Sequence, residues 1–409
     1  MRRHYGLLWW LSALVAATPL LVLPSFTYGQ TYLQTNLVSN SSSIPAVTID
    51  PNLVNAWGLV QGPTTPFWVS DQGTNKATLY NGAGTGIPLV VSVPTATHPP
   101  NGPTGMVFDV GGAGSFPLPT SSGATVSSLF IFANLNGQIS GWNPGSTGGF
   151  SSAVVAVPAS GASYTGLAIN ATGSLLYAAN DKVGGGINVF NSAWMSQGTL
   201  PPLSASGITL PSNYAPYNVT DINGTLFLAY SGLCTSSTGC TSSGVSFPIG
   251  LPVPGEGNGA IIEYDPTTMK YSELVAPTAM NGLNVPWGFA LAPSTFGKFS
   301  NDLLVGDFGS GWISAYNPTS GAFLGFLDTN SGMPLENGGL WTLLFGNGAA
   351  GTSRNTLYIT AGGAPHPFQT VGWLAAIEPT PEPATLLLFG VGLLALGFIF
   401  YRKQRRARV

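Results

Sequence analysis

Charged residues are scarce in this chain of 409 residues, where only 7% are Asp, Glu, Lys or Arg. An average soluble domain has about 25%. Because exposed helix faces need many such residues, the composition argues against a helix-rich cytosolic enzyme. The shortage does not indicate disorder, since 44% of the residues are hydrophobic and 11% are aromatic, which is enough for a large core.

Histidine and the short motifs of common enzymes are equally rare. The three histidines are His4, His98 and His366, which leaves little room for a His-rich metal site. His98 and His366 both neighbour prolines, so we expect them in loops. The chain has no Gly-x-Ser-x-Gly elbow, no His-Glu-x-x-His and no phosphate-binding Gly-rich loop followed by Lys-Ser or Lys-Thr.

The N-terminus has the pattern of a secretory signal peptide. Basic residues at 2–4 precede an apolar run from Leu7 to Val22, and small residues stand at Thr27 and Gly29. We predict removal of residues 1–29, the alternative being a permanent anchor helix. Pro19 and Pro24 favour the cleaved form.

The C-terminus carries a second apolar segment. Residues 384–401 contain no charge and would reach about 27 Å as a helix, close to the roughly 30 Å of a bilayer core. This run predicts one C-terminal transmembrane helix. A cluster of basic residues follows it and predicts a cytoplasmic end by the positive-inside rule: Arg402, Lys403, Arg405, Arg406 and Arg408.

The three parts of this tail, in this order, resemble the PEP-CTERM sorting signal of Gram-negative bacteria. Pro381-Glu382-Pro383 stands first, the apolar run second and the Arg-rich end last. The resemblance implies recognition by exosortase, an inner-membrane cysteine peptidase-like transpeptidase, after export by the general secretion machinery. It also implies an inner-membrane-anchored precursor and delivery to the cell surface or an exopolysaccharide matrix. Glu382 would then belong to a processing signal. An ordinary C-terminal anchor is the alternative.

Between these ends, residues 30–380 form one predicted domain, followed by the sorting signal at 381–409. Residues 31–380 hold five Lys or Arg against fourteen Asp or Glu, a formal net charge of 5 − 14 = −9. A surface so poor in cations cannot neutralise phosphates, so nucleic-acid binding is excluded as a function. Binding to an anionic membrane surface is disfavoured for the same reason.

This domain repeats one unit six times. Each copy has a short apolar strand, a second strand ending near Asp or Asn, and a third strand with an aromatic residue near its end. The anchors of the copies lie 47, 61, 52, 70 and 54 residues apart: Trp57, Thr104, Thr165, Tyr217, Trp287 and Trp341. Steps of this size predict an all-β, six-bladed β-propeller of four-stranded blades. Two stacked sandwiches are the alternative.

The sixth copy has no room for a fourth strand before the tail. The strand-like segment 32–38 precedes the first copy and is unassigned. We therefore predict that this N-terminal strand pairs with the sixth blade, which closes the ring and removes an exposed edge.

The second and third strands with their turn, as in residues 69–77, are similar to NHL-type propeller repeats. The domain also resembles an uncharacterised propeller family that travels with exosortase tails. Residues 50–59 and 67–71 carry that resemblance. The family implies a fold and no mechanism.

Acidic and amide residues at the ends of the second strands are candidates for polar sites. Asp71, Asn134, Asp181 and Asp307 can bond the turn that follows each strand, which is the structural interpretation. The functional alternative for Asp71, Asp181 and Asp307 is a calcium site, although Ca²⁺ needs six to eight oxygens. We expect no other cofactor or metal.

Aromatic residues and cysteines complete the candidates. Trp57, Trp287 and Trp341 begin the first strands, where they would pack near the axis or, alternatively, contact a ligand such as a sugar ring. Phe67 and Trp68 are predicted to be core residues. Cys234 and Cys240 are predicted to form a disulfide in an exported protein; without a nearby histidine they cannot complete a zinc site.

Two functions follow from these features. The first is a non-enzymatic, exported propeller that binds an extracellular polysaccharide or envelope protein or has a structural role at the surface. The second is a propeller hydrolase, lyase or quinoprotein-like enzyme with a site at the axis, since the fold hosts many chemistries.

Overall fold

The computed structural model of the protein describes residues 30–95, 102–363, 370–381 and 390–398. Several sequence predictions fall outside these ranges, namely the signal peptide at 1–29, His98 and His366, Glu382 and Pro383 of the sorting motif, and the basic residues Arg402, Lys403, Arg405, Arg406 and Arg408.

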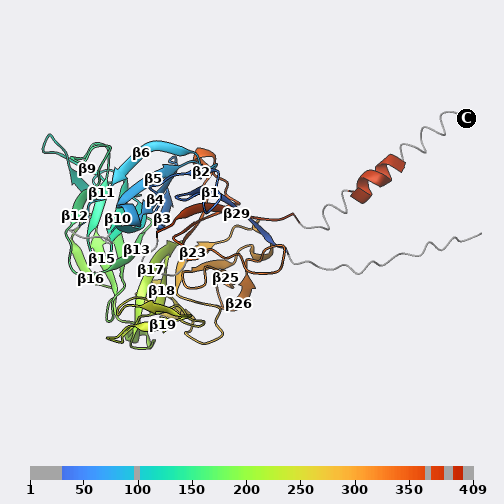
Figure 1. Ribbon diagram of the computed structural model, residues 1–409. Helices are drawn as coiled ribbons and strands as arrows, with labels where there is room; N and C mark the ends of the chain where they lie inside the picture. The colour runs from blue at the N-terminus through green and yellow to red at the C-terminus, as the bar shows by residue number, and fades with distance from the viewer. Residues whose placement is uncertain (1–29, 96–101, 364–369, 382–389, 399–409) are drawn as a thin grey trace, which may run out of the picture.

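Six antiparallel sheets are arranged radially around one axis (Figure 1), which confirms the prediction of an all-β, six-bladed propeller. The strands of the blades, from the axis outward, are as follows. Blade 1 has β3 (Ala56–Gln61), β4 (Phe67–Asp71), β5 (Lys76–Tyr80) and β6 (Gly86–Ser92). Blade 2 has β7 (Pro103–Phe108), β10 (Phe130–Asn134), β11 (Ile139–Trp142) and β12 (Val154–Val157). Blade 3 has β13 (Tyr164–Ile169), β14 (Leu175–Asn180), β15 (Ile187–Asn191) and β16 (Ser196–Thr199).

The second half of the chain repeats this order. Blade 4 has β17 (Tyr214–Ile222), β18 (Thr225–Gly232), β21 (Ala260–Asp265) and β22 (Lys270–Val275). Blade 5 has β23 (Pro286–Leu291), β24 (Leu303–Asp307), β25 (Ile313–Tyr316) and β26 (Phe323–Phe326). Blade 6 has β27 (Leu340–Phe345), β28 (Leu357–Ala361), β29 (Trp373–Pro379) and β1 (Tyr32–Ser39), with β2 (Thr48–Ile49) outside.

All six predicted anchors lie in the innermost strand of their blade. The two longest steps between anchors contain inserted hairpins, which follow the first strand in blade 2 and the second strand in blade 4. β8 (Pro117–Pro119) and β9 (Thr125–Ser127) lengthen blade 2, and β19 (Cys240–Ser242) and β20 (Val245–Phe247) lengthen blade 4. Short 3₁₀ turns occupy other loops: η1 (Gln72–Thr74), η2 (Leu203–Ser206), η3 (Gly297–Phe299) and η4 (Ala349–Gly351).

The N-terminal strand closes the ring, as the sequence predicted. β1 pairs antiparallel with β29 from Tyr32↔Pro379 to Ser39↔Trp373. Its Gln34 side chain exchanges two amide hydrogen bonds of 2.8 Å with Asn337, which lies in the connection between blades 5 and 6. The last blade is thus completed by the first strand of the chain, and β1 covers the edge of β29 that would otherwise be exposed.

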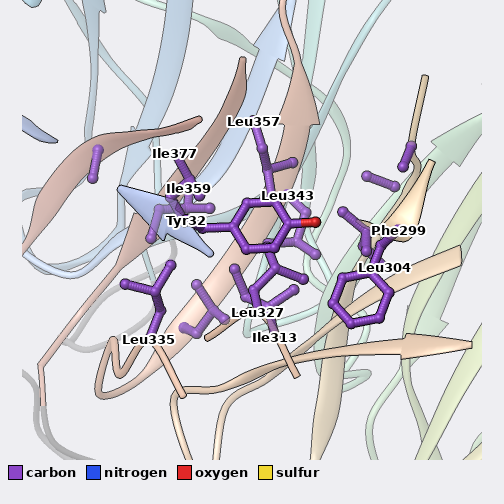
Figure 2. Packing of buried hydrophobic residues seen from close by; sticks show 14 of the residues in the cluster. Tyr32, Phe299, Leu304, Ile313, Leu327, Leu335, Leu343, Leu357, Ile359 and Ile377 are labelled. Carbon is purple, nitrogen blue, oxygen red and sulfur yellow. The ribbon is translucent and has the colours of Figure 1, made fainter. Parts of the chain in front are cut away.

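The hydrophobic core is divided among the interfaces between blades. Six clusters of buried side chains each lie between two neighbouring blades, and a seventh lies on the axis. Between blades 5 and 6, the Tyr32 ring of β1 lies among Phe299, Leu304 and Leu343 (Figure 2). Burial between sheets explains why a single blade is not an independent unit.

Close approach of the inner strands depends on small residues. A Cβ atom at Gly58 would lie 2.5 Å from the carbonyl oxygen of Thr104, and one at Gly288 would lie 2.3 Å from that of Trp341. Gly105 and Gly166 occupy the same position of their blades, and their Cβ atoms would also meet the next inner strand. The glycine that follows the anchor residue in blades 1, 2, 3 and 5 is therefore required for the close packing of the inner strands.

Beyond blade 6, residues 390–398 form a short helix. Among the described residues, no helix is long and apolar enough to cross a membrane.

Candidate functional site

An aromatic cluster fills the axis at the end where the innermost strands begin. Trp57, Tyr217, Trp287, Trp341 and Phe308 are all buried there, with Val285. The Trp57 and Trp341 rings are stacked, with centroids 3.5 Å apart, and Trp287 meets each of them edge-on. The three predicted tryptophans are thus together, and they contact one another. Stacking on a sugar ring would require ring faces that are exposed to solvent, whereas these three rings are buried. Ligand contact by the three tryptophans therefore stays a prediction.

Hydrogen bonds fix the cluster to the surrounding strands. Trp341 Nε1 donates to Asn55 Oδ1 at 2.8 Å, and Trp287 Nε1 donates to the carbonyl of Thr165 at 3.2 Å. Trp57 Nε1 is buried and donates to no described residue. Two bonded indoles and the stacking restrict the rings to one arrangement.

A cavity of about 410 Å³ occupies the other half of the axis, on the side where the innermost strands end. All six innermost strands line it, and most of its wall is apolar. Leu59, Met106, Leu167, Phe289 and Leu343 contribute one side chain from each of five blades. The volume lies within the range of small-molecule sites, about 300–1,000 Å³.

Half of the polar side chains in this cavity come from β17 of blade 4, and Gln61, Thr342 and Asn347 supply the others. Asn218 is buried at the inner end, and its Nδ2 donates to the Trp287 carbonyl at 2.6 Å, while Oδ1 accepts no hydrogen bond from a described residue. Thr220 and Asp221 follow and are half-buried. Asp221 Oδ1 accepts a 2.9 Å hydrogen bond from the Gly224 amide in the turn to β18. Burial raises the pKa of Asp221.

The buried acids predicted at the second strands lie on the opposite face. Asp71 ends β4, Asp181 follows β14 and Asp307 ends β24, and all three are buried. In the described part of the chain, no group of three His, Cys, Asp or Glu comes together as a metal site. Calcium binding by these residues stays a prediction.

Only one of these acids is well supplied with hydrogen bonds, and not from the turn that follows it. Asp307 accepts from the Asn284 amide at 2.9 Å and from Ser314 Oγ at 2.8 Å. Burial raises its pKa to about 7, although both donors oppose the shift. In the part of the chain that the structure describes, neither carboxylate oxygen of Asp71 accepts a well-formed hydrogen bond. Burial raises the pKa of Asp71 well above its ordinary value, and the nearby Thr78 hydroxyl opposes this shift. Burial alone does the same at Asp181.

The two cysteines are joined. Cys234 and Cys240 form a disulfide with Cα atoms 5.6 Å apart, at the base of the β19–β20 hairpin. Cys240 borders a polar surface hollow with Tyr214 and Thr278. The bridge closes a short loop, so we expect it to stabilise chiefly this hairpin, by about 2 kcal/mol.

The sequence offered a site at the axis as an alternative, but the residues that line the cavity were not identified from it. A signal was present, because the Gly of the aromatic-Gly or Thr-Gly pair is replaced in blades 4 and 6, by Asn218 after Tyr217 and by Thr342 after Trp341. Both replacements donate a hydrogen bond to the next inner strand, Asn218 to Trp287 and Thr342 to Trp57. The two positions at which the repeat lacks its glycine, Asn218 and Thr342, thus line the cavity.

Comparison with known proteins identifies the tail. Residues 379–406 match the family model of the PEP-CTERM protein-sorting motif. The chain is therefore a six-bladed β-propeller with a PEP-CTERM sorting motif at its C-terminus, which indicates an exported protein.

Two relatives found by sequence are described as uncharacterized proteins. One protein of Acanthamoeba polyphaga mimivirus is 25% identical over 308 residues, which cover 75% of this chain and 76% of the relative. A second from the same virus is 26% identical over 306 residues, covering 74% and 71%.

Solved structures with similar architecture are more distant. Virginiamycin B lyase from Staphylococcus aureus has a TM-score of 0.45 at 11% identity, covering 85% of this chain and 99% of that one. A Bacteroides thetaiotaomicron protein of unknown function has a TM-score of 0.47 at 11% identity, covering 85% and 76%. Likenesses of this size assign no activity to the chain.

Proposed function

We propose that this protein is exported, sorted through its C-terminal tail by an exosortase, and then serves as a non-enzymatic binding or structural component of the cell surface or the exopolysaccharide matrix. The observation that carries the proposal is the match of residues 379–406 to the PEP-CTERM protein-sorting motif. The apolar run at 384–401 would hold the precursor in the inner membrane before processing.

The limits of the propeller support a removable tail. The last strand, β29, ends at Pro379, and the Thr380 amide donates to the Thr31 carbonyl at 2.8 Å. The Pro-Glu-Pro sequence that starts at Pro381 therefore follows directly after the last residue that is hydrogen-bonded to the segment leading into the closing strand. Removal of residues 381–409, like removal of 1–29, would take away no strand of the six blades.

The test follows the tail in a host with and without its exosortase. An epitope inserted at Ser122, in the exposed turn of the β8–β9 hairpin, would remain on the processed protein. We expect the wild type to reach the surface or matrix fraction without its tail. In the exosortase-deficient host, or with Glu382→Ala, the full-length chain should stay in the inner membrane.

Glu336→Ala is the matched control, since it removes an exposed carboxylate from the propeller and should sort as the wild type does. A mature C-terminus still at Val409 in the exosortase-positive host would instead establish an ordinary anchor.

A further inference from the structure

The axial cavity is enclosed by the inner strands and is open at one end. The buried aromatic cluster of Trp57, Trp287 and Trp341 fills the axis on one side, so access is from the side where the inner strands end. Six strands from six blades form the wall, so its shape is set by the closed ring. Such a concave, mostly apolar space with a few polar groups is the usual form of a small-molecule site.

Polarity along the wall increases toward the mouth on a single strand, β17. Asn218 is buried at the inner end, Thr220 is half-buried, and Asp221 stands where the strand turns into β18. Asp221 is the one charged side chain of the lining, which includes no Lys or Arg. Its Oδ1 atom accepts the Gly224 amide, whereas Oδ2 accepts no hydrogen bond from a described residue. One carboxylate oxygen is thus left for a ligand.

The cavity continues over its rim into a second hollow. This hollow has about 650 Å³ and lies against the β8–β9 hairpin, and both spaces are bordered by Pro63, Phe108 and Val110. The acid there, Asp109, already accepts from Ser115 Oγ at 2.5 Å and from the Gly111 amide at 2.8 Å. A larger apolar group can therefore extend into this hollow beside a carboxylate that already accepts two hydrogen bonds.

We propose that the axial cavity binds a small organic ammonium ion, with the apolar part of the ligand between the inner strands and its N–H group on the free oxygen of Asp221. An anionic ligand of the same shape would meet a carboxylate and no compensating cation. A neutral one would fill the apolar wall but would lack the ionic hydrogen bond, which is stronger than a neutral one. The site does not depend on the route by which the protein is exported.

The experiment compares three probes with one ring system: 1-naphthylmethylammonium, 1-naphthylmethanol and 1-naphthoate. Isothermal titration calorimetry is carried out at neutral pH on the protein purified from its host in the form that cells retain. We expect the ammonium probe to bind at least about fivefold more tightly than the alcohol, and naphthoate to show no measurable binding. Asp221→Asn keeps an acceptor for the Gly224 amide, and it should remove the preference for the ammonium probe while leaving the alcohol unchanged.

Two further variants separate the site from general effects. Glu263→Gln removes a half-buried carboxylate from the same blade outside the cavity and should leave all affinities unchanged. Thr220→Trp places a large ring in the mouth and should weaken both the ammonium and the alcohol probes at an unchanged melting temperature. The proposal is overturned if naphthoate binds as well as the ammonium probe, if Asp221→Asn has no effect on the preference, or if Thr220→Trp changes neither affinity.

Discussion

The indole rings of Trp57 and Trp341 lie face to face, with centroids 3.5 Å apart and planes inclined by 14°. The two residues are 284 positions apart in the sequence (341 − 57), and they begin the innermost strands of the first and sixth blades. Their contact exists because the ring is closed, so it reports directly on the joining of the two ends of the chain.

Truncation of Trp341 should therefore destabilise the whole propeller. Trp341→Ala removes the stacking partner of Trp57 and leaves Asn55 Oδ1 without its indole donor. We expect a loss of about 3–5 kcal/mol in the free energy of unfolding, measured by chemical denaturation. Trp312→Ala is the control, because this half-buried ring contacts Phe326 away from the axis, and its loss should be clearly smaller. Equal losses would contradict a special role of the axial cluster.

The closing strand offers a second test. Deletion of residues 31–40 removes the partner of β29 and should lower the melting temperature sharply. The point substitution Tyr32→Ala empties a site between Phe296 and Phe299 and should cost about 3–5 kcal/mol. Tyr32→Phe loses only the 3.1 Å hydrogen bond to the Phe296 carbonyl, about 1 kcal/mol.

Leu33→Ala is the matched control for this strand. Leu33 is the neighbour of Tyr32 and is 59% exposed, so the substitution should change stability by less than about 0.5 kcal/mol. An unchanged melting temperature after the deletion would show that the ring does not rely on this closure.

The inner-strand glycines should not tolerate a methyl group. Gly288→Ala would place a Cβ atom 2.3 Å from the Trp341 carbonyl oxygen, which belongs to the backbone of the next blade. Strands must separate to accept it, and we expect a loss of about 1–3 kcal/mol in thermal or chemical unfolding. Gly255→Ala, with no atom within 4 Å of the added Cβ, should be nearly neutral. A neutral Gly288→Ala would refute the close-approach explanation of the repeat.

Buried acids make stability depend on pH. Burial raises the pKa of Asp307 from 3.8 to about 7 in the folded protein. Between these values the folded state binds more protons than the unfolded state, so this group makes stability fall as pH rises from about 4 to 7 and then level off. Asp71 and Asp181 act in the same direction, because burial raises both pKa values.

Asp307→Asn should therefore flatten the decline in melting temperature between pH 4 and pH 7. The amide still offers Oδ1 to the Asn284 amide and faces Ser314. Asp265→Asn serves as the opposite control. The Thr267 amide lowers the pKa of this exposed acid, so its contribution is present above the unfolded pKa and is lost as the solution is acidified. A wild-type decline that persists in Asp307→Asn would exclude Asp307 as its source.

The repeat was readable from the sequence because four of the six inner strands meet the same packing requirement with the same residue, a glycine directly after the anchor. Trp57, Thr104 and Thr165 mark the starts of inner strands, since each precedes a glycine that must approach its neighbour closely. The closing strand was predicted by counting, because the sixth copy lacked a fourth strand. The partners of Asp307 were not predicted, because a turn-forming acid and a buried acid bonded to a distant loop have the same local sequence.

By itself, the sequence determined the number and order of the blades, the three inner strands of each blade and the sorting tail, because these depend on local patterns and on contacts between segments adjacent in the chain. The tertiary structure decided what the axis contains. Six inner strands whose anchor residues lie 47–70 residues apart in the sequence meet there, so the axial contacts join residues that no local pattern relates. Only closure of the ring placed Trp57 against Trp341 and brought Asp221 to the mouth of a cavity.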